Sequence, residues 1–198
     1  MRPGKTSLGL STCLLLLLLA GCGTSAPVRY YGLVPVETQV LYPAPEEFAI
    51  AVGPVRIAEY LNRQQIVTRA GGVSVELGNY DRWTEPLAEA CQRTLTDNLA
   101  TLLGSDRVLE YPAHTAMDHG YVLPAQITRF DTDAAGLAVL EVQWTLRNIQ
   151  ENVIIPARRS RYTGPVSDPN DYESIVESLS ELVGAFSRDV AAALAELP

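Results

Sequence analysis

Alternating apolar and polar residues predict several β-strands along the chain. Residues 48–55 alternate and are expected to form a central strand that ends at Gly53-Pro54. After Tyr121 two longer strands alternate in the same way, and a loop at residues 131–136 joins them into an antiparallel hairpin. Shorter strands are expected at residues 28–33, an edge position, at 73–77 and 107–111, and at 152–162, where Arg158, Arg159 and Arg161 favour a solvated edge.

Apolar residues spaced three and four apart predict an amphipathic helix in the first half of the chain. It is expected to begin between Arg82 and Glu85, because Pro86 is tolerated only in the first turn of a helix. Gly104 is a typical C-terminal residue for it. Its buried stripe is predicted to contain Leu87, Cys91, Leu95, Leu99 and Leu102.

A second amphipathic helix is predicted at residues 170–197, with Asn170 and Glu173 as a capping pair. Helical and strand patterns therefore follow each other in the order β, α, β, β, β, α. Together they predict an α+β fold, a single domain in which two amphipathic helices pack on one face of a mixed or antiparallel sheet.

The first 21 residues have the pattern of a secretory signal peptide. Arg2 and Lys5 precede an apolar stretch at residues 8–20, which is too short for a helix that needs about 20 residues to cross a bilayer. Leu19-Ala20-Gly21-Cys22 then matches the bacterial lipobox. Cys22 is therefore predicted to become the lipidated first residue of the mature protein.

The mature chain is expected to contain a lipidated tether at residues 22–45 and one domain at 46–198. Without Arg2 and Lys5, 13 basic residues stand against 23 acidic ones, which gives a formal net charge of −10. This balance argues against nucleic-acid binding, so membrane attachment is expected to come from acyl chains in outer-membrane lipid. Gly23 stands where an inner-membrane retention signal would have aspartate, which favours the outer membrane.

Residue types that carry chemistry are few, and we expect neither an enzyme nor a cofactor. His114 and His119 lack the spacing of a helical metal site and a third ligand. Cys91 is expected to be an inert core thiol. Asp131 and Asp133 flank a turn, where carboxylates usually accept hydrogen bonds from nearby N–H groups.

Residues 56–69 mix arginine and glutamine with aliphatic residues and do not have the composition of an ordinary loop. Two explanations are open: the rest of the domain covers the apolar residues, or a partner covers them and the segment is a recognition surface. Under the second hypothesis the partner-binding residues are Arg56, Tyr60, Leu61, Arg63, Gln65, Ile66 and Arg69, together with Trp83 at the entrance of the first helix.

Several motifs resemble the ABC-type transport auxiliary lipoproteins. Besides the lipobox at Cys22, they are Tyr30-Tyr31-Gly32-Leu33, residues 52–57, 60–63 and 65–69, Arg82-Trp83-Thr84-Glu85-Pro86-Leu87, and Asn98-Leu99. The resemblance covers nearly the whole mature chain. The family often has proline where this chain has Ala58 and Gln64.

The resemblance implies a function that composition alone does not. PqiC-like members of that family are outer-membrane lipoproteins that work with an inner-membrane transport component and a periplasm-spanning MCE-domain protein in lipid or hydrophobic-molecule transport. This chain would then dock the MCE protein at the outer membrane, and a homo-oligomer is one form that it could take there. Two alternatives stay open: a self-contained lipid carrier with its own cavity, and a structural envelope lipoprotein.

Overall fold

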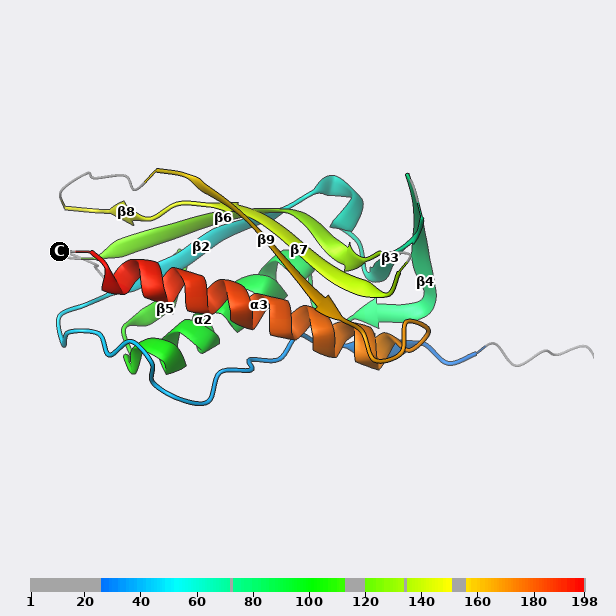
Figure 1. Ribbon diagram of the computed structural model, residues 1–198, viewed down its shortest axis with the longest axis horizontal. Coiled ribbons are helices and arrows are strands. Elements are labelled where there is room, and N and C mark those ends of the chain that lie inside the picture. The colour runs from blue at the N-terminus through cyan, green and yellow to red at the C-terminus, as the bar shows by residue number, and fades with distance from the viewer. Residues whose placement is uncertain (1–25, 72, 113–119, 134, 151–155, 198) are drawn as a thin grey trace, which may run out of the picture.

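The computed structural model describes residues 26–71, 73–112, 120–133, 135–150 and 156–197. A six-stranded sheet forms one layer, and the helices α2 (Leu87–Leu103) and α3 (Tyr172–Ala195) cover one of its faces (Figure 1). The strand order is β5-β2-β6-β7-β9, and β8 pairs with β6. These strands are β2 (Ile50–Ile57), β5 (Val108–Glu110), β6 (Tyr121–Thr132), β7 (Leu137–Trp144), β8 (Arg147–Asn148) and β9 (Arg158–Pro165).

This sheet is mixed. Strand β2 runs parallel to both of its neighbours, β5 and β6. Strands β6, β7 and β9 are antiparallel, which confirms the predicted hairpin after Tyr121. The predicted fold class, one α+β domain with two helices on one face of the sheet, is therefore confirmed.

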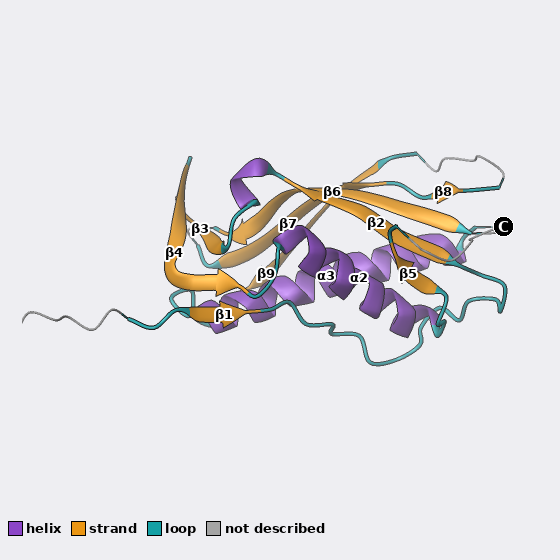
Figure 2. Cartoon of the chain, turned by 180° about the vertical axis from the view of Figure 1, so that it is seen from behind, coloured by secondary structure: helices purple, strands orange, loops and turns teal. Residues whose placement is uncertain are grey.

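A second, three-stranded sheet was not predicted. Its order is β1-β4-β3, with β1 (Arg29–Tyr31) parallel to β4 (Ser74–Trp83) and β3 (Gln65–Gly71) antiparallel to β4. It stands at one end of the long sheet, and the short 3-10 helix η1 (Glu59–Leu61) leads from β2 into β3 (Figure 2). The predicted strand at residues 73–77 is thus only the first half of a longer one.

The core lies between the long sheet and the helices. The α2 residues of the predicted stripe are all buried, and so are the inward-facing residues of β6 and β7. Gly104 ends α2 in the left-handed conformation with φ of 60°, as its position predicted. In α3, the apolar side chains of Val183, Phe186 and Val190 face the same core.

Several predicted boundaries are wrong. Strand β2 does not end at Gly53-Pro54 but continues to Ile57, because the pairing with β6 shifts register between Val52 and Val55 and accommodates a proline that cannot donate to the ladder. Helix α2 begins later than expected, at Leu87.

The cap of α3 also differs from the expected Asn170 and Glu173 pair. Asp171 is the N-cap, and its carboxylate accepts a hydrogen bond of 3.0 Å from the Ser174 N–H. Asp171 itself lies in the extended conformation that an N-cap residue needs.

The predicted tether is partly inside the domain. Residues 32–45 form a strap that follows β1 and crosses the helices. The N–H groups of Leu41 and Tyr42 donate to the Leu102 carbonyl at 3.0 Å, and that of Ala44 donates to the Leu103 carbonyl at 3.0 Å. These carbonyls belong to the last turn of α2, where no intrahelical donor remains. The packed domain therefore begins near Arg29, before the expected boundary at residue 46.

Within the described ranges, neither helix is both long and apolar enough to cross a membrane.

Candidate functional site

The segment predicted as a recognition surface, residues 56–69, folds into the end of β2, η1 and most of β3. The Ala58 N–H donates to the Ile127 carbonyl at 2.9 Å, which fastens the end of β2 to β6. The Leu61 N–H then donates to the Ala58 carbonyl at 2.9 Å, and the Leu61 side chain is buried. The chain therefore turns here around an apolar anchor.

A fully buried carboxylate lies directly beside this segment. Asp131 on β6 accepts hydrogen bonds from the Tyr60 hydroxyl at 2.9 Å and from the Arg69 Nε at 2.9 Å, both at one oxygen. Its other oxygen accepts from the Arg129 Nε at 2.8 Å. The Arg69 guanidinium also lies 5.5 Å from the centre of the Tyr60 ring. We call these four residues the Asp131 cluster; it joins η1, β3 and β6.

Two cationic partners and a hydroxyl keep the buried Asp131 carboxylate satisfied, so the cluster is a structural joint between the two sheets. Burial raises the pKa of Tyr60, and the neighbouring Asp131 charge raises it further, so the phenol stays protonated as a donor. The expectation that Asp131 serves a turn was wrong. Asp133 does that, since its Oδ1 accepts from the N–H groups of Ala135 at 2.9 Å and Leu137 at 3.0 Å.

Three of the predicted partner-binding residues belong to the core of the domain. Leu61, Ile66 and Trp83 are 1%, 0% and 5% exposed. The Trp83 ring packs on Phe130 with centroids 6.3 Å apart. Of the two explanations that the sequence left open, the first therefore holds for these three residues: the domain itself covers them.

The other predicted residues divide into two groups. Tyr60 and Arg69 meet in the Asp131 cluster, whereas Arg56 and Arg63 are exposed and Gln65 is partly exposed. The structure therefore does not bring all eight predicted residues into one surface. A partner-binding role for the exposed ones stays a prediction.

Arg56 instead belongs to a row of polar side chains across four strands of the long sheet. Arg56 on β2 pairs with Gln126 on β6, Gln126 pairs with Gln143 on β7, and Gln143 pairs with Arg159 on β9. All four side chains are exposed. Successive residues of a strand face opposite sides, and Ala125 faces the helices, so this outer row lies on the sheet face that α2 and α3 leave uncovered. Figure 2 shows both helices beneath the other face.

A shallow groove of about 310 Å³ runs beside the outer row, with Pro54 and Pro124 among its lining residues. A neighbouring hollow of about 410 Å³ shares these two prolines and adds Val122 and Ile149. Guanidinium and amide groups next to apolar walls are suited to a protein surface that offers carboxylates and carbonyls. Sequence reasoning missed Gln126 and Arg159; the signal that identifies them is the cross-strand register, which requires the pairing to be known.

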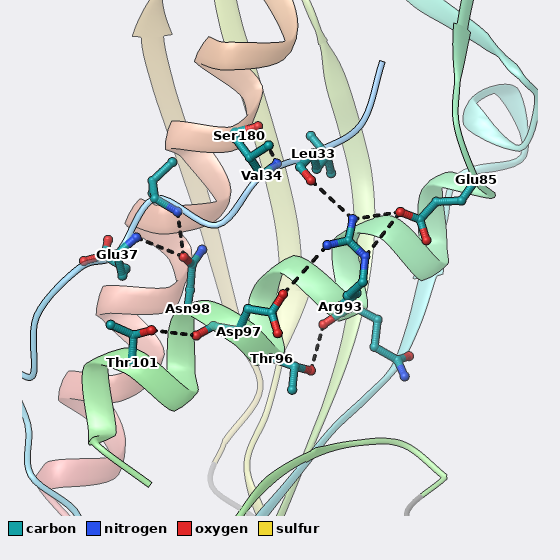
Figure 3. Close-up of polar contacts among 12 residues, drawn as sticks. Leu33, Val34, Glu37, Glu85, Arg93, Thr96, Asp97, Asn98, Thr101 and Ser180 are labelled. Atoms are coloured by element: carbon teal, nitrogen blue, oxygen red, sulfur yellow. Dashed lines mark hydrogen bonds and ion pairs between the residues drawn. The ribbon is translucent and has the colours of Figure 1, made fainter. Parts of the chain in front are cut away.

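The strap over the helices is held by polar side chains of α2 and α3 (Figure 3). The buried Asn98 amide oxygen accepts from the N–H groups of Val36 at 2.9 Å and Glu37 at 3.1 Å. The Ser180 hydroxyl accepts from the Val34 N–H at 3.3 Å. Arg188 on α3 pairs with the Glu37 carboxylate.

Arg93 on α2 completes these contacts. It donates to the Leu33 carbonyl at 3.2 Å and forms ion pairs with Glu85 at 2.7 Å and Asp97 at 3.7 Å. One guanidinium thus connects the strap, the entrance of α2 and the next turn of that helix. Hydrogen bonds therefore hold the strap from Leu33 to Ala44, where it reaches the last turn of α2.

Cys91 lies within the core, and burial raises the pKa of its thiol to about 12. Among the described residues, no three histidine, cysteine, aspartate or glutamate side chains are grouped as metal ligands would be. His114 and His119 lie outside the described residues.

Solved structures of other proteins have a fold similar to that of this chain. Its fold is similar to that of an uncharacterized protein of known crystal structure, with a TM-score of 0.71, 20% identity, and coverage of 85% of this chain and 99% of the other. It is also similar to protein XCC0632 from Xanthomonas campestris, with a TM-score of 0.65, 15% identity, and coverage of 82% and 92%. At these identities the likeness concerns the fold alone.

A comparison with curated proteins finds no match. The family model described as "ABC-type transport auxiliary lipoprotein component" matches residues 31–191, from the end of β1 to the last turns of α3. The match includes the strap, the Asp131 cluster and the outer row. The chain therefore belongs to the family of ABC-type transport auxiliary lipoproteins.

Proposed function

We propose that this lipoprotein docks a periplasm-spanning MCE-domain protein to the outer membrane, as one component of an envelope system that moves lipids or other hydrophobic molecules and maintains membrane integrity. Family membership supports the transport part of this proposal. The lipobox at Cys22 supports the anchor, and Gly23 favours the outer membrane as its destination. The inner-membrane partner is the transport component that the family name implies.

The filled core favours docking over carriage of a lipid inside the domain. Between the sheet and the helices, the described residues enclose a cavity of only about 10 Å³, next to Cys91 and Phe186. Small-molecule sites usually have volumes of about 300–1,000 Å³. This close packing is the observation that favours docking over carriage. A carrier needs an apolar space for acyl chains, whereas a docking protein needs only an outer surface.

The outer row is the surface that we assign to the partner. It is exposed, lies away from the helices, and places two arginines among amides beside the groove. In a chain whose mature net charge is −10, two arginines at the ends of one cross-strand row give a locally basic contact. A partner surface with carboxylates and carbonyls would complement it.

Co-purification tests docking against carriage directly. The acylated chain is isolated from crosslinked membranes of its own bacterium to identify the attached proteins, and the domain without Cys22 is purified from the periplasm without detergent or refolding to identify any lipid that it carries. We expect an MCE-domain protein among the crosslinked partners and no stoichiometric lipid in the domain. Stoichiometric lipid without any MCE-domain protein would refute docking and favour the carrier.

A further inference from the structure

Exposed apolar side chains gather on the three-stranded sheet. Val73, in the turn between β3 and β4, is 97% exposed, and Tyr30 on β1 is 60% exposed. Single exposed apolar residues are common on proteins, but here six of the twelve large apolar side chains exposed in the described part of the chain lie on or beside the strands of this one small sheet, which indicates a contact surface. The others of this group, between 38% and 43% exposed, are Val28, Val75, Leu77 and Tyr80.

The same sheet lies next to the predicted lipid anchor. Cys22 precedes Val28 by six residues, which span at most about 20 Å when fully extended. Strand β1 then pairs directly with β4, Tyr30 opposite Arg82. The described chain begins at Ala26 at the end of the long axis where β4 stands, and the C-terminus lies at the opposite end (Figures 1 and 2).

We infer that Val73 and the other exposed apolar side chains of the three-stranded sheet rest in the interfacial layer of the membrane beside the acyl chains. This inference rests on the lipid anchor of the proposed function. Tyrosine suits such a place, because its ring is apolar and its hydroxyl stays hydrated. Val73 is the most exposed of these side chains, at 97%.

The contact is apolar rather than electrostatic. Asp81 on β4 is already neutralised by an ion pair with Arg29 at 2.8 Å. The net charge of the mature chain repels an anionic surface. Binding therefore needs no anionic lipid, and salt leaves it unchanged.

This arrangement fixes the orientation of the molecule. The three-stranded sheet faces the membrane, and the opposite end of the long axis, with β8 and the C-terminus, points away from it (Figure 1). The outer row is then held at a set distance from the bilayer, where a periplasmic partner approaches it.

A fluorescence experiment with single labels tests the contact. The acylated chain with Cys91→Ala carries an environment-sensitive fluorophore at Val73→Cys or, as a matched control, at Ile149→Cys, which is 40% exposed at the far end after β8. Each is reconstituted into phosphatidylethanolamine–phosphatidylcholine vesicles with or without lipids that carry a nitroxide quencher on the acyl chain. We expect a blue shift and loss of most fluorescence to quencher at Val73→Cys, neither at Ile149→Cys, and no effect of salt.

Three outcomes overturn the inference. If mass measurement confirms acylation and the chain sediments with the vesicles, but the Val73→Cys label is neither shifted nor quenched, the anchor holds and the membrane contact does not exist. If the chain is not acylated and does not sediment, both the proposed anchor and this inference fail. If the label is already blue-shifted in a Cys22→Ala chain without vesicles, a second copy of the chain covers the turn instead.

Discussion

The Arg69 guanidinium on β3 donates a 2.9 Å hydrogen bond to the carboxylate of Asp131 on β6, a side chain with no exposure to solvent. The two residues belong to different sheets and stand 62 positions apart in the chain. Their bond, with those from Tyr60 and Arg129 to the same carboxylate, fastens the small sheet to the long one beside the apolar packing of Trp83 on Phe130. Arg69, which the sequence predicted as a partner-binding residue, thus has a structural role.

Arg69→Ala is expected to lower the free energy of unfolding by about 1–3 kcal/mol. It removes one of the two charged donors of the buried Asp131 carboxylate, which keeps the Arg129 guanidinium and the Tyr60 hydroxyl. Arg63→Ala is the matched control: Arg63 is exposed in the same segment, and its loss should leave stability unchanged. Urea unfolding of both variants measures the difference. Equal midpoints for the two variants would contradict a joint at Asp131.

The Asp131 cluster also shows where sequence reasoning stops. Alternation and helical spacing predicted the long strands, both helices and their buried faces, because these patterns are local. The three donors of Asp131 come from three elements, two of them more than 60 residues away, so no local pattern identifies them. Asp133, whose partners are two and four residues away, behaves as its sequence context predicted.

The candidate site has the same limit. The sequence singled out residues 56–69 from composition, but composition does not separate Ile66, which faces the core, from Arg56, which faces solvent. The outer row depends on the register of three strand pairs, none of which is encoded locally. The predicted edge with Arg158, Arg159 and Arg161 was right in kind, since β9 is the last strand in the sheet order.

Asn98→Ala is expected to release the strap. It removes the acceptor of the Val36 and Glu37 N–H groups and should cost about 1–3 kcal/mol of stability, the usual penalty for buried polar groups left unpaired. It should also make residues 32–45 more susceptible to protease in the native protein. Thr101→Ala is the control, because the Thr101 hydroxyl donates to the Asp97 carbonyl of its own helix and, among the described residues, not to the strap. Equal cleavage of both variants would show that the strap is held without Asn98.

Cys91 is expected to be unreactive in the folded protein. Burial raises the pKa of its thiol from 9.0 to about 12, so a thiol reagent at neutral pH should label it only on unfolding. The unfolded thiol loses its proton at a lower pH than the folded one. The contribution of the Cys91 thiol to the free energy of unfolding is therefore fully present below about pH 9 and falls as pH rises toward 12. Cys91→Ala should flatten that part of the stability–pH curve while costing stability through a small cavity. Rapid labelling of native protein, or an unchanged curve, would contradict this.

Cys22→Ala should leave the domain folded and abolish its acylation and outer-membrane fractionation. The residue lies seven positions before β1, and the described domain has its core elsewhere. The measurements are incorporation of labelled palmitate, membrane fractionation and the thermal unfolding midpoint. A variant that still incorporates palmitate and fractionates with the outer membrane would refute Cys22 as the lipidated residue.

The outer row makes the sharpest test of partner binding. Arg56→Ala and Arg159→Ala remove exposed side chains and should leave the melting temperature nearly unchanged, since solvated charges contribute about 0–1 kcal/mol to folding. Both should weaken binding to the MCE-domain protein by more than about 1 kcal/mol, because the planar guanidinium can bind carboxylates or carbonyls of a partner with two hydrogen bonds.

Two further variants show whether a loss of binding comes from a lost surface contact or from unfolding of the domain. Arg107→Ala removes an exposed arginine outside the row and should change neither stability nor binding. Ile66→Ala, at a fully buried side chain, should cost about 2–5 kcal/mol of stability and reduce binding only as far as it unfolds the domain. If the row variants bind as wild type and Arg63→Ala weakens binding instead, the partner contacts the exposed part of residues 56–69. If none of the exposed arginines affects binding, the basic contact is wrong, and docking must use a surface that is not arginine-dependent.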